Sequence, residues 1–145
     1  MTYPDLYVAT LLNEYFVPVQ LDVSKETKLV DKYRAFWTPN LNVLDGEERM
    51  TYHVEGWLPA AEYSAMLLLA LGRHQILQKR PAGGVPFLQE VMDKFPSTTF
   101  APEALYYLGV AQYLVSHEVE DLVEGWKQLQ RRYPSSSWAL SAGIV

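Results

Sequence analysis

The chain has 145 residues, a length that forms one domain or two small ones. Hydrophobic residues make up 49% and charged residues 20%, proportions that are ordinary for a folded globular protein and argue against disorder. The formal net charge is −5, so the chain offers no basic surface for phosphate backbones and we expect no nucleic-acid partner.

Cysteine is absent, which excludes disulfide bonds, thiolate nucleophiles and thiolate metal ligands. The longest apolar run, residues 66–71, is far shorter than the roughly 20 residues that cross a bilayer, and the first residues lack the pattern of a signal peptide. We therefore expect no membrane partner and take a cytoplasmic location as the default.

A helix and a strand are predicted for the first 23 residues. The helix covers Pro4–Tyr15, with Pro4 in its first turn and Asp5 near the positive end of its dipole. Its predicted inward face consists of Leu6, Ala9, Leu12 and Phe16. Phe16–Val23 is rich in β-forming residues and is predicted to be a strand, in which Pro18 favours an edge or a bulge.

A second helix and a β-hairpin are predicted next. Ser24 is expected to cap a helix over Lys25–Arg34. Its predicted apolar face consists of Leu29, Val30 and Tyr33. Leu41–Leu44 is predicted to be a strand, Asp45-Gly46 is a strong turn signal, and Arg49–Val54 returns as the antiparallel partner.

The remainder is predicted to be helical. One helix begins at Pro59, and Pro81-Ala82-Gly83-Gly84 is the best candidate for a linker, which divides the chain into domains of residues 1–80 and 81–145. Three further helices follow, and a last short one is expected near Trp138. The predicted inward residues of the four longer helices are Tyr63, Met66, Leu67, Ala70 and Leu71; Leu88, Val91, Met92 and Phe95; Leu105, Leu108, Ala111 and Val115; and Leu122, Trp126, Leu129 and Tyr133.

An internal repeat runs through this second part. It becomes visible when the sequence is shifted by 38 residues. The corresponding pairs are Leu88 and Trp126, Val91 and Leu129, Phe95-Pro96-Ser97 and Tyr133-Pro134-Ser135, Phe100-Ala101 and Trp138-Ala139, and Ala104 and Ala142. The agreement covers a helix, its end and the start of the next helix, so the pattern predicts a repeated pair of helices.

Residues 2–72 resemble the C-terminal four-fifths of a thioredoxin-like domain. Trp37-Thr38-Pro39 stands where that family has a cis proline before its third core strand. Asp45-Gly46 and Gly56 match its hairpin turn and the glycine before its last helix. The family's first strand and its motif with two cysteines would precede Met1, so the resemblance implies an incomplete fold without its redox centre.

Residues 86–145 resemble tetratricopeptide repeats. Leu105, Leu108-Gly109 and Tyr113 follow the pattern of the first helix of such a unit, and Pro134 matches the proline that closes the second. Fusions of these two kinds of domain are a recognisable bacterial architecture. The expected fold class is therefore α/β plus α, an incomplete thioredoxin-like fold followed by a tetratricopeptide-like region of helical hairpins.

The missing first strand has a physical consequence. In the thioredoxin fold it lies between the strands that correspond to Val17–Val23 and Leu41–Leu44, so each of these would expose unpaired backbone groups. Such groups cost about 1–3 kcal/mol each when they are buried without a partner. Either the two strands pair directly or each pairs with a second copy, and we expect association as a homodimer because apolar surface must also be hidden.

Five residues are candidates for binding a peptide. In thioredoxins the backbone beside the proline of Thr38-Pro39 pairs with an extended substrate, but such a proline can also serve only to set strand geometry. Trp37 is either a surface anchor or packs under Phe36. Tyr106 and Tyr113 either contribute to the peptide groove of tetratricopeptide helices or belong to the core between helices.

No catalytic residue, metal site or cofactor motif is recognised. The three histidines lie in unrelated segments without metal-ligand spacing and are expected to be solvated or locally bonded. Asp45, Glu47 and Glu48 cluster at the hairpin tip, where exposure to water is expected to leave them without an acid–base role.

Two functions remain open. The first is a redox-inactive module for protein–protein interaction, with a protein or peptide partner and a tendency to self-associate. The alternative is a thiol–disulfide oxidoreductase whose Cys-x-x-Cys lies upstream of Met1, so that any enzymatic activity would depend on residues outside this sequence. An in-frame Cys-x-x-Cys directly upstream of the Met1 codon would favour the second.

Overall fold

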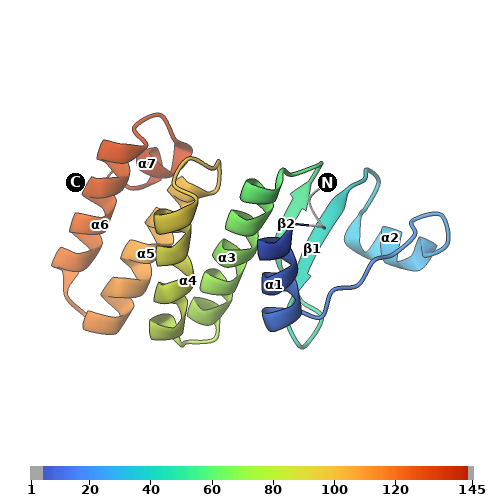
Figure 1. Ribbon diagram of the computed structural model, residues 1–145. Helices are drawn as coiled ribbons and strands as arrows, with labels where there is room; N and C mark the ends of the chain where they lie inside the picture. Colours follow the sequence, from blue (N-terminus) through green and yellow to red (C-terminus); the bar gives the residue numbers. More distant parts are fainter. Residues whose placement is uncertain (1–4, 144–145) are drawn as a thin grey trace. The chain divides into compact units, whose positions relative to one another are not determined.

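The computed structural model describes residues 5–143. The protein is mostly helical, with two N-terminal helices, a β-hairpin and then a stacked run of antiparallel helices (Figure 1). The elements are α1 (Leu6–Tyr15), α2 (Thr27–Tyr33), β1 (Asn40–Leu44), β2 (Met50–Glu55), α3 (Ala60–Leu77), α4 (Pro81–Lys94), α5 (Ala101–Ser116), α6 (Val119–Arg132) and α7 (Ser137–Ser141). Among residues 5–143, no helix combines the length and the apolar composition that a membrane span requires.

The chain divides into two compact units, Met1–Tyr63 and Ser64–Val145. The first contains α1, α2 and the hairpin, and the second contains most of α3 and the helices from α4 to α7. Of the residues described between positions 5 and 63, only Val8, Leu11 and Tyr63 are buried. Most of the hydrophobic core therefore belongs to the helices of the second unit.

Asp5 caps α1 at its N-terminus. Its carboxylate accepts hydrogen bonds from the main-chain N–H groups of the second and third helical residues, at 3.0 and 3.1 Å. Asp5 therefore precedes the helix, whereas Pro4 lies outside the described residues. The predicted inward face was wrong, because Val8 and Leu11 are buried while Leu6 is largely exposed.

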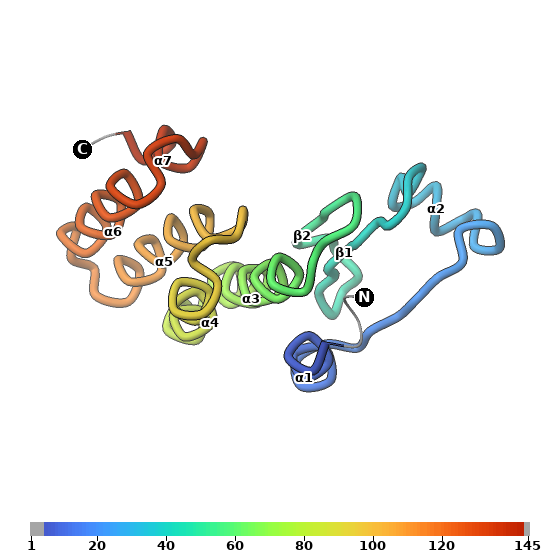
Figure 2. The backbone as a smooth tube through the Cα atoms, turned by 45° about the horizontal axis from the view of Figure 1, so that its top comes forward, coloured from blue at the N-terminus to red at the C-terminus, as the bar shows by residue number. Residues whose placement is uncertain are grey.

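The strand predicted over Phe16–Val23 does not form. Phe16 ends α1 with an extended backbone, at φ −129° and ψ 160°. Residues 17–21 then continue between α1 and α2 without a strand partner (Figure 2). The composition is that of a strand, but β-propensity acts through pairing with neighbours, and the described residues provide no neighbour here.

Ser24 does not cap α2. Its N–H and its hydroxyl instead donate to one carboxylate oxygen of Asp22, at 2.9 and 2.6 Å, within a turn that precedes the helix. The helix begins only at Thr27 and ends before Arg34, whose backbone is left-handed with a φ of 51°. The predicted apolar residues Leu29, Val30 and Tyr33 are half-buried.

The predicted hairpin is confirmed. β1 and β2 pair antiparallel, with Leu41 opposite Val54 and an irregularity between Val43 and Leu44. These two strands make up the sheet in the residues that the structure describes. The Thr38–Pro39 peptide bond that precedes β1 is cis, as the resemblance implied.

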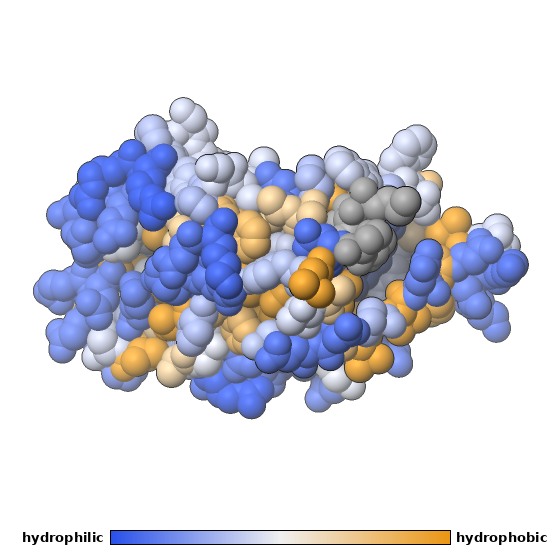
Figure 3. Space-filling view, in the orientation of Figure 1, coloured by the Kyte–Doolittle hydropathy of each residue, from blue (hydrophilic) through white to orange (hydrophobic). Residues whose placement is uncertain are grey.

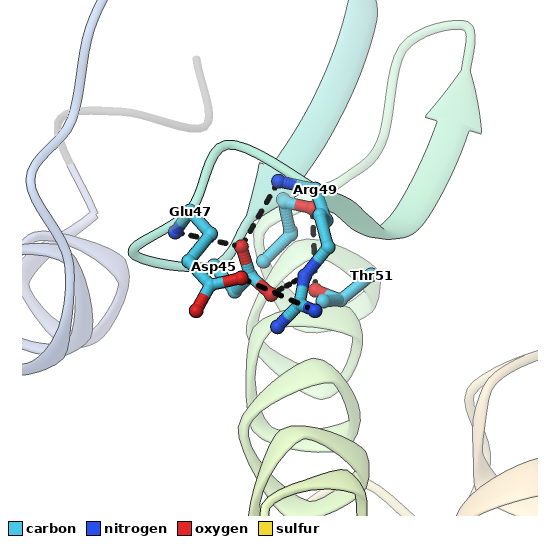
Figure 4. Close-up of polar contacts among 5 residues, drawn as sticks. Asp45, Glu47, Arg49 and Thr51 are labelled. Carbon is cyan, nitrogen blue, oxygen red and sulfur yellow. Dashed lines mark hydrogen bonds and ion pairs between the residues drawn. The ribbon is translucent and has the colours of Figure 1, made fainter.

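Asp45 organises the hairpin turn (Figure 4). Its carboxylate accepts hydrogen bonds from the N–H groups of Glu47 and Arg49, both at 2.9 Å, and from Nε of Arg49 at 2.8 Å. The left-handed position is Glu48, with a φ of 61°, and not Gly46. The Asp45 side chain is 6% exposed, so the expectation of a solvated carboxylate was wrong for this residue. Hydrogen bonding, above all from the Arg49 N–H, lowers the pKa of Asp45.

The central part of α3 is buried around its circumference. Every residue from Tyr63 to Ala70 is buried. The predicted inward residues Tyr63, Met66, Leu67 and Ala70 are confirmed, and Leu71 is half-buried. A helix that is apolar all round occupies an interior position, so the prediction of a single inward face was too narrow.

Residues 81–84, predicted as a linker, form the first turn of α4. Pro81 occupies an N-terminal helical position, where its missing N–H costs no helical hydrogen bond. Gly84 is buried, and a Cβ at this position would lie 2.7 Å from the carbonyl oxygen of Gly72 in α3. Gly84 therefore permits close helix packing, and the segment is not a flexible junction.

The internal repeat is confirmed by the helices. The first and last residues of α4 and α6 are related by the same 38-residue shift. After each helix the carbonyl of an aromatic residue, Phe95 or Tyr133, accepts a hydrogen bond from the hydroxyl of Thr98 or Ser136 respectively. The equivalent buried pairs are Leu88 and Trp126, Val91 and Leu129, Ala101 and Ala139, and Ala104 and Ala142. Val115, predicted to face inward on α5, is exposed.

Candidate interaction surface

Residues 17–21 expose apolar side chains and a free backbone. Val17 is 91% exposed, Val19 72% and Leu21 46%, and these alternate residues would share one face of a strand. Within the described part of the chain, none of the N–H groups of this segment donates a hydrogen bond. Figure 3 shows hydrophobic side chains at the surface along the chain between α1 and α2. The segment has the chemistry of a strand that lacks its neighbour.

Ordered structure holds both ends of this segment. On one side the Phe16 N–H donates to the carbonyl of Leu12, which closes α1 at 3.1 Å. On the other side Asp22 accepts two hydrogen bonds from Ser24 through its carboxylate, and its carbonyl accepts two main-chain hydrogen bonds. The Ser24 hydroxyl is the main cause of a lowered pKa of Asp22. The free stretch is therefore short and has defined limits.

Three aromatic side chains are exposed beside the hairpin. Phe36, Trp37 and Trp57 are each at least 65% exposed. The N–H of Gly56 donates to the carbonyl of Pro39 at 2.8 Å, which extends the strand pairing and places Trp37 and Trp57 near the same end of the hairpin. Since both Trp37 and Phe36 are exposed, the expected packing of Trp37 under Phe36 is not present. Aromatic side chains are enriched among the residues that anchor protein interfaces.

A chain of hydrogen bonds runs across one face of the hairpin. His53 Nδ1 lies 2.9 Å from Asn42 Oδ1, and His53 Nε2 lies 3.3 Å from Glu55 Oε1. Asn42 Nδ2 donates to Asn40 Oδ1 at 2.8 Å, whereas Nδ2 of Asn40 is buried without a partner. His53 is therefore locally bonded, as expected. No group of three or more metal-ligating side chains occurs among residues 5–143.

The predicted peptide-binding residues lie in both units. Trp37, Thr38 and Pro39 are consecutive exposed residues before β1. Tyr106 and Tyr113 lie two turns apart on α5 in the second unit, and both are half-buried. The structure brings together the first three of these residues and, separately, the two tyrosines.

Tyr106 belongs to an aromatic cluster. Its ring stacks on Trp126 with centroids 4.9 Å apart, and the rings of Trp138 and Tyr107 lie 5.1 and 5.3 Å away. Nε1 of Trp126 donates to the main-chain carbonyl of Tyr106 at 3.3 Å. The cluster joins α5 to α6 and α7. This position of Tyr106 agrees with its interpretation as a residue of the core between helices.

The sequence did not reveal that Val17, Val19 and Leu21 are uncovered. Their alternation is the same as that of a half-buried strand, because a covered and an uncovered strand have the same pattern. The one available signal was Pro18, which already favoured an edge.

Comparisons with known proteins identify no relative. A scan against protein-family models found no match, and neither curated proteins nor solved structures gave a significant match.

Proposed function

We propose that the protein is a redox-inactive module for protein–protein interaction that self-associates through its N-terminal unit. The observation that carries this proposal is the distribution of apolar side chains. Most of the exposed large hydrophobic side chains lie in the first unit, although this unit is the smaller one. A domain of about 60 residues depends on burying about 60% of the surface of its unfolded chain, so a partner that covers these side chains would stabilise the unit.

The resemblances give this proposal a more specific form. We take the first unit as an incomplete thioredoxin-like fold and the helices as tetratricopeptide-like, an architecture in which both parts contact proteins. Trp37, Thr38 and Pro39 in the first unit and, separately, Tyr113 in the second are the proposed contacts to a protein or peptide, whereas Tyr106 packs in the aromatic cluster between helices. Thiol–disulfide exchange by this chain is excluded because the thiolate is the nucleophile and the sequence has no cysteine.

The mass of the full chain in solution tests the proposal. Sedimentation equilibrium at micromolar concentration is expected to give a homodimer, and a monomer over the whole measurable range would overturn self-association. An insulin-reduction assay is expected to give no dithiol-dependent turnover with this polypeptide.

The second candidate is a longer thiol–disulfide oxidoreductase. The unpaired segment 17–21 favours it, since a strand from the same polypeptide would pair without the loss of translational and rotational freedom that association entails. A polypeptide extended by an upstream Cys-x-x-Cys would then be monomeric and would reduce insulin. A dimeric extended chain without insulin reduction would exclude this candidate.

A further inference from the structure

We infer that two copies of the chain pair through residues 17–21 as antiparallel β-strands, related by a twofold axis at Val19. This inference rests on the proposed self-association and specifies the surface that achieves it. The partner is thus a second copy of this chain, and the contact is a two-stranded ribbon that neither copy can form alone.

Pro18 determines which edge of the segment can pair. In an extended chain the N–H groups of alternate residues point to opposite sides. The side with Val17, Val19 and Leu21 has three donors, whereas the side with Pro18 and Gln20 has one, because proline has no N–H. Pairing on the first side therefore uses the better edge and leaves Pro18 facing outward, where its missing donor costs nothing.

A twofold axis at Val19 pairs this edge with itself. Val17 then lies opposite the partner's Leu21, and Val19 lies opposite the partner's Val19. These are hydrogen-bonded pairs, so each of the three donors in one copy meets a carbonyl of the other. The symmetry is isologous, and the contact closes at two copies on this edge.

The side chains fit the same register. Val17, Val19 and Leu21 of both copies lie on one face, and β-branched and aliphatic cross-strand pairs stabilise antiparallel strands. Residues 16–21 contain no charged side chain, so the pairing buries no charge and opposes no like charges. A register in which odd residues oppose even ones would divide the apolar side chains between the two faces and bring Pro18 into the ladder.

Residues 17–21 can pair without the loss of an existing hydrogen bond of the described chain. Its ends are held by the last turn of α1 and by the Asp22 turn, and none of its N–H groups must leave another acceptor within the described chain. The cost of ordering on association is lower for a segment whose ends are fixed. No helix or strand has to unfold for the two copies to meet.

Two proline variants test the register in the full chain. Val19→Pro removes the N–H donor at the axis from both copies, and we expect the dimer dissociation constant to rise about tenfold or more. Gln20→Pro is the matched control, since it removes a donor that faces outward and keeps Val19 in the extended region that precedes a proline. Its dissociation constant is expected to stay within about threefold of the wild-type value.

The readouts are sedimentation equilibrium and amide hydrogen exchange. In the wild-type dimer the amides of Val19 and Leu21 are expected to exchange slowly and that of Gln20 rapidly. Far-UV circular dichroism is expected to be unchanged in both variants, because residues 17–21 lie outside every helix.

The outcomes distinguish the strand pairing through residues 17–21 from self-association in general. A dimer that tolerates Val19→Pro, or that is weakened equally by both variants, would overturn the strand pairing and leave self-association standing. A dimer weakened only by Gln20→Pro would assign the contact to the other edge and would also overturn the inference. A monomeric wild-type chain would overturn both.

Discussion

Replacing Gly84 by alanine is expected to destabilise the helical unit. A Cβ at this position would lie 2.7 Å from the carbonyl oxygen of Gly72, which is a backbone atom of a buried helix and has no free rotation by which to move aside. We place the cost at the upper end of overpacking, about 3 kcal/mol. Alanine recovers about 1 kcal/mol of helix propensity relative to glycine, which leaves a net loss of about 2 kcal/mol.

The adjacent glycine provides the control. A Cβ at Gly83 would lie 2.9 Å from Oε1 of Gln75, the far end of a flexible and half-buried side chain. Gln75 can rotate away, so Gly83→Ala keeps the gain in helix propensity and is expected to be neutral or to stabilise by up to about 1 kcal/mol.

Thermal unfolding followed by far-UV circular dichroism distinguishes the two variants. One kcal/mol corresponds to about 4–8 °C for a domain of this size, so the Tm of Gly84→Ala should fall by about 10 °C. The Tm of Gly83→Ala should equal or exceed that of the wild type. A Gly84→Ala variant that melts at or above the wild-type temperature would show that Gly84 is not required for close packing of α4 against α3.

Three further predictions concern single side chains. Trp126→Phe removes the Nε1–H that donates to a main-chain carbonyl in α5 and is expected to lower the free energy of unfolding in urea by about 1–2 kcal/mol; an unchanged midpoint would contradict this role. Tyr133 donates its hydroxyl to a carbonyl of the preceding repeat, and burial raises its pKa. The hydrogen bond therefore contributes fully to the free energy of unfolding below about pH 10, and this contribution declines as the pH rises beyond it. Absorbance titrations of the wild type and of Tyr133→Phe should differ by one ionisation step, and that step should lie above the ordinary tyrosine range. The pKa of Asp45 is lowered, first by the N–H of Arg49 and then by its guanidinium, so the hairpin is stabilised fully above about pH 4 and loses this contribution as the pH falls through the folded pKa. NMR shifts of the hairpin amides should move in that acidic range in the wild type, and the step that belongs to Asp45 should be absent in Asp45→Ala.

The helices of the second unit could be predicted because their signals are local. Apolar residues three and four positions apart identify one face, and the pairs Leu88 and Trp126 and Val91 and Leu129 mark the same face in two helices. The glycines at 83 and 84 were misread for the opposite reason. Glycine is a common signal of a loop, whereas Gly84 serves a close approach to Gly72 that only the folded chain creates.

The strand predicted over Phe16–Val23 failed because a strand is defined by its neighbour. A helix satisfies its N–H and C=O groups within one segment, but a strand requires a second segment that the pattern of the first does not specify. The hairpin was predictable because its partner follows after a short turn. The candidate interaction surface arises at residues 17–21, where β-forming sequence has no partner in the described chain.

A helix satisfies its backbone groups within one segment and a strand does not, and for this reason the two units differ in their dependence on a partner. The helices of the second unit satisfy their backbone internally and enclose a core, so their stability is a property of one chain. In the first unit the described chain leaves the apolar side chains of residues 17–21 and the aromatics near the hairpin exposed, and a second copy that pairs with residues 17–21 would stabilise the bound state by mass action. Dilution below the dissociation constant should therefore release amide protection in residues 17–21 while leaving the amides of α4 to α6 protected.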